Sequence, residues 1–170
     1  MEINVHIASN EDYQTVGKLM VEVYAALEGF PSPEEQPEYY HVLANIGEFA
    51  KKESVDILIA TSESDILGAV VYINDLADYS ANINLEEEKE SAAFRLLAVS
   101  DKARGLGIGK LLTNACIEKA RSNGLSQVII HTTDSIKVAW GMYEKMGFVR
   151  STDLDFFQVG MPVLGFRMKL

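Results

Sequence analysis

Apolar positions recur along the chain at two spacings, one typical of strands and the other of helices. Alternating or continuously apolar segments predict strands at 3–7, 55–60, 66–73, 92–99, 127–131, 148–152 and 164–169. Apolar residues at i, i+3, i+4 and i+7 predict helices at 10–28, 36–52, 108–122 and 136–146. The polar and acidic residues 75–90 are expected to form a loop. This order of elements indicates a mixed α/β fold, with residues 1–170 forming a single domain.

Several residues predict where the helices begin and end. Gly124 follows the third helix and is expected to act as its C-cap glycine. Asp134 or Ser135 is expected to cap the start of the fourth helix, and Gly147 to end it.

Composition narrows the class of protein further. The chain has 170 residues, 48% of them hydrophobic, and a formal net charge of −10. A nucleic-acid-binding protein would show a basic face, so that class is disfavoured. No apolar run reaches the about 18 residues of a membrane span, and the N-terminus does not resemble a signal peptide. With Cys116 as the single cysteine, these features predict a cytoplasmic protein without a membrane partner.

The most informative stretch lies between a buried strand and the N-terminus of an amphipathic helix. It reads Val-Ser-Asp-Lys-Ala-Arg-Gly-Leu-Gly-Ile-Gly-Lys over residues 99–110. Glycines let the backbone approach a ligand closely. The first amides of a helix lack partners within it and carry partial positive charge, so this turn is suited to a phosphate.

The glycine spacing excludes two common phosphate-binding motifs. A dinucleotide-binding G-x-G-x-x-G fails because Lys110 or Leu112 occupies the third glycine position. A Walker A loop fails because Arg104 replaces its first glycine and Leu111 follows Lys110.

The stretch does match R-x-x-G-x-G, and its surroundings agree. Leu97-Ala98-Val99 ends the strand before the turn, and a further strand follows about twenty residues later. A helix then ends in Tyr143 ahead of the pair Gly147-Phe148. Over residues 91–150 the chain resembles the GNAT superfamily of acetyl-CoA-dependent N-acetyltransferases.

The resemblance implies a mixed, mostly antiparallel central sheet of about six to seven strands flanked by about four helices. It implies direct transfer of an acetyl group from acetyl-CoA to the primary amine of a small molecule or peptide. It also implies a possible homodimer. No cluster of Cys and His residues in the sequence suggests a metal site, so no metal is expected. The residues implied to bind the cofactor are Leu97, Ala98, Val99, Arg104, Gly105, Leu106, Gly107, Ile108, Gly109 and Lys110.

The resemblance assigns catalytic roles less completely. Tyr143 stands where the family places a general acid, although it is also consistent with a core aromatic residue. Many members carry a glutamate on the strand before the turn, where this chain has Arg95. Glu90 and His131 remain as candidate bases. Arg95 is expected to pair with an acid of the closing segment, Asp153 or Asp155; if it faces the cleft instead, it would bind an acceptor carboxylate.

Two other functions are compatible with these residues. Without a working base, the same fold would be a non-catalytic module that binds or senses CoA. Alternatively, the turn would hold a different phosphate ligand such as a nucleotide.

Overall fold

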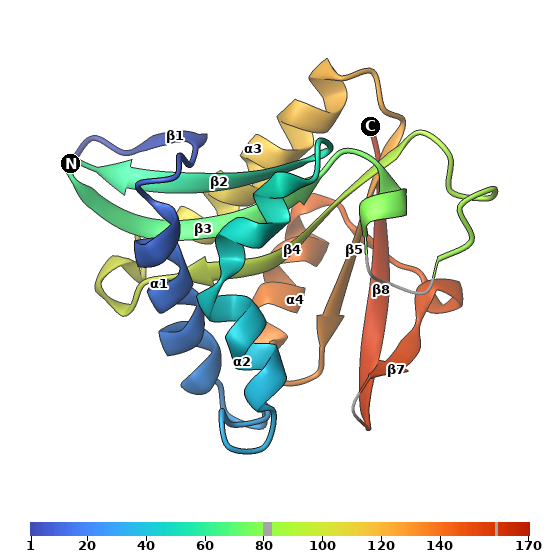
Figure 1. Cartoon of the computed structure of the whole chain (residues 1–170). Helices are drawn as coiled ribbons and strands as arrows, with labels where there is room; N and C mark the ends of the chain where they lie inside the picture. Colours follow the sequence, from blue (N-terminus) through green and yellow to red (C-terminus); the bar gives the residue numbers. More distant parts are fainter. Residues whose placement is uncertain (80–82, 159) are drawn as a thin grey trace.

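The computed structural model describes residues 1–79, 83–158 and 160–170, and shows one eight-stranded sheet with helices on both faces (Figure 1). The sheet order is β1-β2-β3-β4-β5-β8-β6, and β7 pairs with β8. Neighbouring strands are antiparallel except β4 and β5, which are parallel. The strands are β1 (Asn4–Ile7), β2 (Val55–Ser62), β3 (Asp65–Ile73), β4 (Ser91–Val99), β5 (Gln127–Thr133), β6 (Val149–Arg150), β7 (Phe156–Gln158) and β8 (Met161–Lys169).

Each face of the sheet has its own hydrophobic core, because side chains alternate between the faces along every strand. α1 (Tyr13–Ala25) and α2 (Pro37–Ala44) cover one face and bury residues such as Ile59 and Val71. α3 (Ile108–Ser122) and α4 (Lys137–Met146) cover the opposite face and bury residues such as Val70 and Phe94. Cys116 is fully buried in this second core, as its place on an apolar helix face predicts.

The mixed α/β fold expected from the sequence is confirmed, with differences in detail. The sheet has eight strands instead of six or seven, because the short β7 adds to the edge of β8. The predicted helix 36–52 ends at Ala44 and is followed by a separate 3-10 helix, η1 (Ile46–Lys51). Asn45 breaks it with φ −105° and ψ 38°, while its side-chain amide donates to the His41 carbonyl at 2.8 Å. Three further 3-10 helices are η2 (Leu76–Asp78), η3 (Asp101–Ala103) and η4 (Thr152–Leu154).

The glycine predicted to end the third helix does so, whereas the side-chain cap predicted for the start of the fourth helix is absent. Gly124 has φ 74° and donates to Arg121, while Leu125 donates to Ala120, both at 3.1 Å, which is a Schellman ending of α3. The expected capping of α4 by Asp134 or Ser135 is wrong. This helix begins after Ile136 with no side-chain cap, and the Ser135 hydroxyl lies 2.7 Å from that of Thr133 instead.

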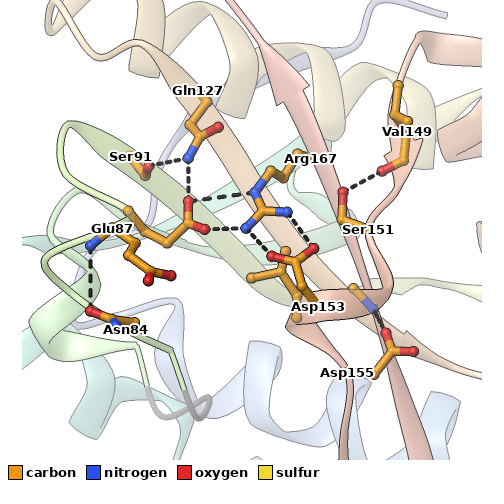
Figure 2. A network of polar contacts seen from close by, with 12 residues as sticks. Asn84, Glu87, Ser91, Gln127, Val149, Ser151, Asp153, Asp155 and Arg167 are labelled. Carbon is orange, nitrogen blue, oxygen red and sulfur yellow. Dashed lines mark hydrogen bonds and ion pairs between the residues drawn. The ribbon is translucent and has the colours of Figure 1, made fainter.

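A polar network around Arg167 ties two connecting segments to the sheet (Figure 2). The Arg167 guanidinium pairs with Glu88, which is 8% exposed, and with both oxygens of Asp153 at 2.8 and 2.9 Å. Gln127 donates to Glu88 at 2.6 Å, so this carboxylate is satisfied in spite of its burial. The network holds η4 against β8 beside the site described below.

None of the helices in the described part of the chain is both long and apolar enough to cross a membrane.

Candidate active site

The parallel strands β4 and β5 pair at their beginnings and then separate. Ser91, Ala92 and Ala93 are in register with residues 127–129, and β4 has no register partner on β5 beyond Ala93 (Figure 1). β5 remains paired with β8 along its whole length. The second half of β4 and the facing edge of β5 therefore form a wedge whose backbone groups are open to a ligand.

A β-bulge in β4 lies at this wedge. Arg95 is in register with Val71 of β3 and Ala98 with Ala69, so β4 contains one more residue than β3 in the interval. Leu96 has φ 57°, an uncommon conformation for a residue with a side chain. Neither Leu96 nor Leu97 has a register partner on β3 or β5. The Leu97 carbonyl accepts from the Tyr24 hydroxyl at 3.4 Å.

The glycine turn begins just beyond the end of β4. Gly105 has φ 81° and Gly107 has φ 75°, and a Cβ at either position would meet nothing within 4 Å. The first intrahelical bond of α3 runs from Leu111 to Gly107 at 3.0 Å. Five amides ahead of Leu111 donate no backbone hydrogen bond within the described chain: Gly105, Gly107, Ile108, Gly109 and Lys110. The turn is therefore a concentrated set of free donors at a helix N-terminus.

Arg104 completes the turn with a positive charge. Its side chain is exposed and pairs with Asp101 at 2.8 Å. An exposed pair of this kind contributes at most about 1 kcal/mol, so a phosphate can replace Asp101 as the partner at little cost.

A cavity of about 160 Å³ opens on the α1–α2 face of the sheet, beside the wedge. Arg95 and His131 project from β4 and β5 into its lining. Tyr24 and Tyr39 line it from the helices, and Tyr79 lies in its wall after η2. The cavity and the glycine turn therefore lie on different sides of the wedge.

His131 is held by two hydrogen bonds. Its Nδ1 lies 2.7 Å from the Tyr79 hydroxyl, and its Nε2 lies 2.8 Å from the Leu154 carbonyl. A carbonyl can only accept, so the neutral ring carries its proton on Nε2 and Nδ1 accepts from Tyr79. Burial lowers the pKa of His131 below its ordinary value, although the Leu154 carbonyl opposes this. The ring is therefore neutral at pH 7.

Arg95 does not pair with the acids expected from the sequence, and that prediction is wrong. Asp153 pairs with Arg167, and Asp155 pairs with Arg150 at 2.5 Å and also accepts from the Gly165 amide at 2.8 Å. The Arg95 guanidinium lies over the Phe49 ring, 5.5 Å from its centroid. Within the described residues it has no ion-pair partner.

Tyr143 lies on the α3–α4 side of the sheet. Its ring packs against Phe94 and Phe148 at centroid distances of 5.9 and 5.6 Å. Burial raises the pKa of its hydroxyl, with smaller contributions from Cys116 and Tyr79. The Tyr143 hydroxyl forms no hydrogen bond with another described residue. At the same time, no described side chain has a fully buried polar atom that lacks a hydrogen-bond partner. The hydroxyl therefore reaches the accessible surface although the ring is buried.

Glu90 lies apart from these groups. It is exposed and directly precedes β4, at the opposite end of that strand from the glycine turn. Its φ of 59° places it in the turn that leads into β4, and its carbonyl accepts from the Ser126 amide at 2.8 Å, just before β5 begins. The structure brings Arg95 and His131 to the wedge but leaves Glu90 away from it.

Sequence reasoning missed the three tyrosines of the cavity. Tyr24 fitted the apolar face of the first helix and Tyr39 lay within the second, so neither carried a separate signal. Tyr79 fell in the polar loop. Among the described residues, no three His, Cys, Asp or Glu side chains are grouped so that they could hold a metal ion.

Comparison with known families gives a match to the acetyltransferase (GNAT) family over residues 20–148. The human N-acetyltransferase 8B is 36% identical over 72 residues, which cover 42% of this chain and 31% of that protein. The mycothiol acetyltransferase of Paenarthrobacter aurescens is 38% identical over 62 residues, which cover 36% of this chain and 19% of that protein. The matches thus span less than a third of these curated relatives.

Solved structures share the fold at low identity. A GNAT-family acetyltransferase from Staphylococcus aureus has a TM-score of 0.75 and 17% identity, covering 99% of both chains. An N-acetyltransferase from Thermoplasma acidophilum in complex with coenzyme A has a TM-score of 0.70 and 17% identity, covering 97% of this chain and 98% of that one. A Salmonella typhimurium protein solved with its cofactor acetyl-CoA has a TM-score of 0.68 and 11% identity, covering 100% and 95%.

Proposed function

The chain belongs to the acetyltransferase (GNAT) family, and from this premise we propose that it moves an acetyl group from acetyl-CoA to a primary amine. The observation that carries the proposal is the wedge between β4 and β5, with a turn of free amides on one side and a cavity on the other. The acetyl donor and the amine acceptor would meet there and react directly in a ternary complex.

Residues 104–110 are the proposed pyrophosphate site. Their five free amides and the Arg104 charge suit an anion, and the open space at Gly105 and Gly107 lets it approach the backbone. Leu97, Ala98 and Val99 would pair with the peptide-like pantetheine arm, because β5 has separated from β4 there. The bulge supports a further role for the Leu97 or Ala98 amide as a donor to the oxyanion formed when the amine attacks the thioester carbonyl.

His131 is the better supported of the two candidate bases, because it lines the cavity and Glu90 does not. Burial keeps its ring neutral, as a base must be before the reaction. Since Nδ1 already accepts from Tyr79, a proton from the amine would reach the ring through the Tyr79 hydroxyl. Tyr79 would take the proton from the amine as it passes its own to Nδ1.

Tyr143 is the proposed donor to the departing thiolate. Its raised pKa keeps the hydroxyl protonated at neutral pH. A free thiol has a pKa of about 8.5, which makes the thiolate a weaker base than a buried tyrosinate. Burial therefore favours a hydrogen bond that stabilises the leaving sulfur over complete proton transfer.

A non-catalytic module that binds CoA is the second candidate. It is favoured by the partners on both ring nitrogens of His131 and by Arg95 in the place of the family glutamate. Such a module would bind acetyl-CoA as tightly as an enzyme but would transfer nothing.

Thermal unfolding with and without acetyl-CoA tests the donor site, with ATP and NAD as controls. A ligand at about 100 times its dissociation constant stabilises the native state by about 2.7 kcal/mol, which is readily seen as a rise in Tm. A rise with acetyl-CoA alone is expected. No rise at millimolar acetyl-CoA, or an equal rise with ATP, contradicts the proposal.

A further inference from the structure

We propose that the acceptor is an amino acid or a close analogue, with a carboxylate near its amine that is bound by Arg95. This inference rests on the proposed acetyl transfer and adds the class of acceptor. It identifies Arg95 as the residue that selects the acceptor. Three features of the cavity lead to it: its charge, the place of Arg95 along β4, and its size.

The cavity has a cationic residue in its lining and no carboxylate to neutralise it. Its lining residues include Arg95 and, among the described part of the chain, no aspartate or glutamate. The residues whose placement is not described, 80–82 and 159, are Ser, Ala, Asn and Val, so they cannot supply an acid either. A partly buried guanidinium is costly unless it is paired or hydrogen-bonded, and the Phe49 ring supplies only a cation–π contact. The missing partner is an anion from outside the chain.

The acidic residues of the loop 75–90 would favour a polycationic acceptor if they faced the cavity, but none of them lines it. Asp75 accepts from the Ala77 amide at 3.0 Å, and Asp78 accepts from the Ser54 hydroxyl at 2.6 Å. Glu88 pairs with Arg167. None of these carboxylates lines the cavity, so it has no attraction for the second positive charge of a polyamine.

The place of Arg95 along β4 limits how far the carboxylate can lie from the amine. Arg95 is two residues beyond the last pair with β5 and two before Leu97, whose amide is a proposed oxyanion donor. Two residues of an extended strand span about 7 Å, which is an upper limit here because Leu96 between them departs from the extended conformation. A molecule whose amine reaches the thioester while its anion reaches Arg95 therefore has the two groups only a few bonds apart. A free α-amino acid meets this condition, and a lysine side chain within a protein does not.

The size and walls of the cavity agree with a small acceptor. Its volume of about 160 Å³ is below the about 300–1,000 Å³ typical of pockets for drug-sized ligands. Phe30, Tyr39 and Phe156 line it, so the rest of the acceptor would meet aromatic surfaces.

The charge of Arg95 also acts on the other groups of the cavity. Burial raises the pKa of Tyr39 to about 12, and Arg95 acts in the opposite direction. The same charge opposes the effect of burial on Tyr79 and adds to the lowering of the pKa of His131. The guanidinium thus creates a positive field in which an anionic acceptor is favoured.

The test compares amino acids with the amines that lack only the carboxylate. Acetyl transfer is measured with phenylalanine, tyrosine and histidine, together with phenethylamine, tyramine and histamine, after a screen of all twenty amino acids. The parent protein is expected to show at least a tenfold higher kcat/KM for its best amino acid than for the matching amine. Hydrogen bonds to charged groups are worth about 1.5–3 kcal/mol, so Arg95→Gln should lower that kcat/KM roughly 10–100-fold, mainly through KM.

Controls separate this effect from damage to the protein. Arg95→Gln should leave the affinity for acetyl-CoA unchanged. Its effect on kcat/KM for the matching amine should be much smaller than its effect for the amino acid, because the amine lacks the carboxylate and only the charge of Arg95 on His131 and Tyr79 is lost. Arg95→Lys keeps the charge without the planar fork, so part of the preference should return. Arg121→Gln makes the same change at an exposed residue of α3 that pairs with Glu118, and should alter nothing.

Each outcome has a definite meaning. Equal use of an amino acid and its amine by the parent protein overturns the inference, whether or not Arg95→Gln folds. The inference is also overturned if Arg95→Gln folds and keeps the preference for the amino acid over the matching amine. It is overturned as well if the protein binds acetyl-CoA but acetylates only amines that lack a carboxylate. Failure to bind acetyl-CoA at all would instead reject the proposed function.

Discussion

Replacing Gly107 with valine is expected to weaken acetyl-CoA binding strongly and to leave the fold intact. Gly107 has φ 75° at the N-cap of α3, directly before three of the free amides. Gly124 has φ 74° beyond the other end of the same helix. A Cβ at either glycine would meet nothing within 4 Å. Gly124→Val is therefore a matched control, with the same backbone conformation and open surroundings but no role in the turn.

The two variants should lose similar stability. A residue with a side chain in the left-handed region costs about 1–2 kcal/mol, and a β-branched one lies at the upper end or above. For a chain of this length, about 2 kcal/mol lowers Tm by about 4–8 °C. Their ligand affinities should differ. Loss of a single hydrogen bond to a charged phosphate costs about 1.5–3 kcal/mol, which weakens binding roughly 10–100-fold.

Isothermal titration with acetyl-CoA, together with Tm values of the free proteins, measures both effects. The expected result is a similar fall in Tm for both variants and a loss of affinity for Gly107→Val alone. If Gly107→Val bound acetyl-CoA as tightly as Gly124→Val, the assignment of the pyrophosphate to this turn would be wrong.

Three further variants test other parts of the account. Tyr143→Phe should lower kcat roughly 10–100-fold with unchanged acetyl-CoA affinity, since a hydrogen bond to a charged group such as the departing thiolate is worth about 1.5–3 kcal/mol. An unchanged kcat would mean that Tyr143 only packs in the core. Burial lowers the pKa of His131 in the folded protein below its ordinary value, so the ring is a neutral base at pH 7. kcat/KM should therefore stay constant just below pH 7 and fall as the pH drops through that lowered pKa and the ring becomes protonated. In His131→Asn this acidic fall of kcat/KM should be absent. Arg167→Met leaves the buried Glu88 carboxylate without its cation and should cost about 3–5 kcal/mol in urea unfolding; the added change Glu88→Gln should recover much of this loss.

The glycine turn could be predicted from the sequence because its features are local. Arg104, Gly107 and Gly109 lie within six residues, and the strand before them and the helix after them show clear periodicity. The Schellman ending at Gly124 was predictable for the same reason. Patterns of this kind depend on backbone conformation and on neighbours along the chain.

Ion pairs could not be predicted in this way, and Arg95 illustrates the reason. From the sequence, Asp153 and Asp155 were its expected partners. In the fold, Asp153 pairs with Arg167 of β8, and Asp155 pairs with Arg150 of β6. Which cation reaches a carboxylate depends on strand order and register, and the sequence pattern does not contain either.

The cavity was missed because its aromatic residues looked like core residues. Tyr24 shares a helix face with buried positions such as Val16 and Met20, and its ring is itself buried. Only the tertiary structure shows that its hydroxyl reaches Leu97 at the β4 bulge. The bulge has no sequence signal either, since Leu96 is an ordinary strand residue apart from its φ of 57°.

The most direct test of the account is the release of CoA thiol from acetyl-CoA in the presence of amines. The panel should contain free amino acids, simple monoamines, polyamines and short peptides, with a control that lacks amine. The account predicts release that depends on both acetyl-CoA and an amine and saturates with each. If acetyl-CoA binds but no amine in the panel increases thiol release, the chain is a CoA-binding module and not an acetyltransferase.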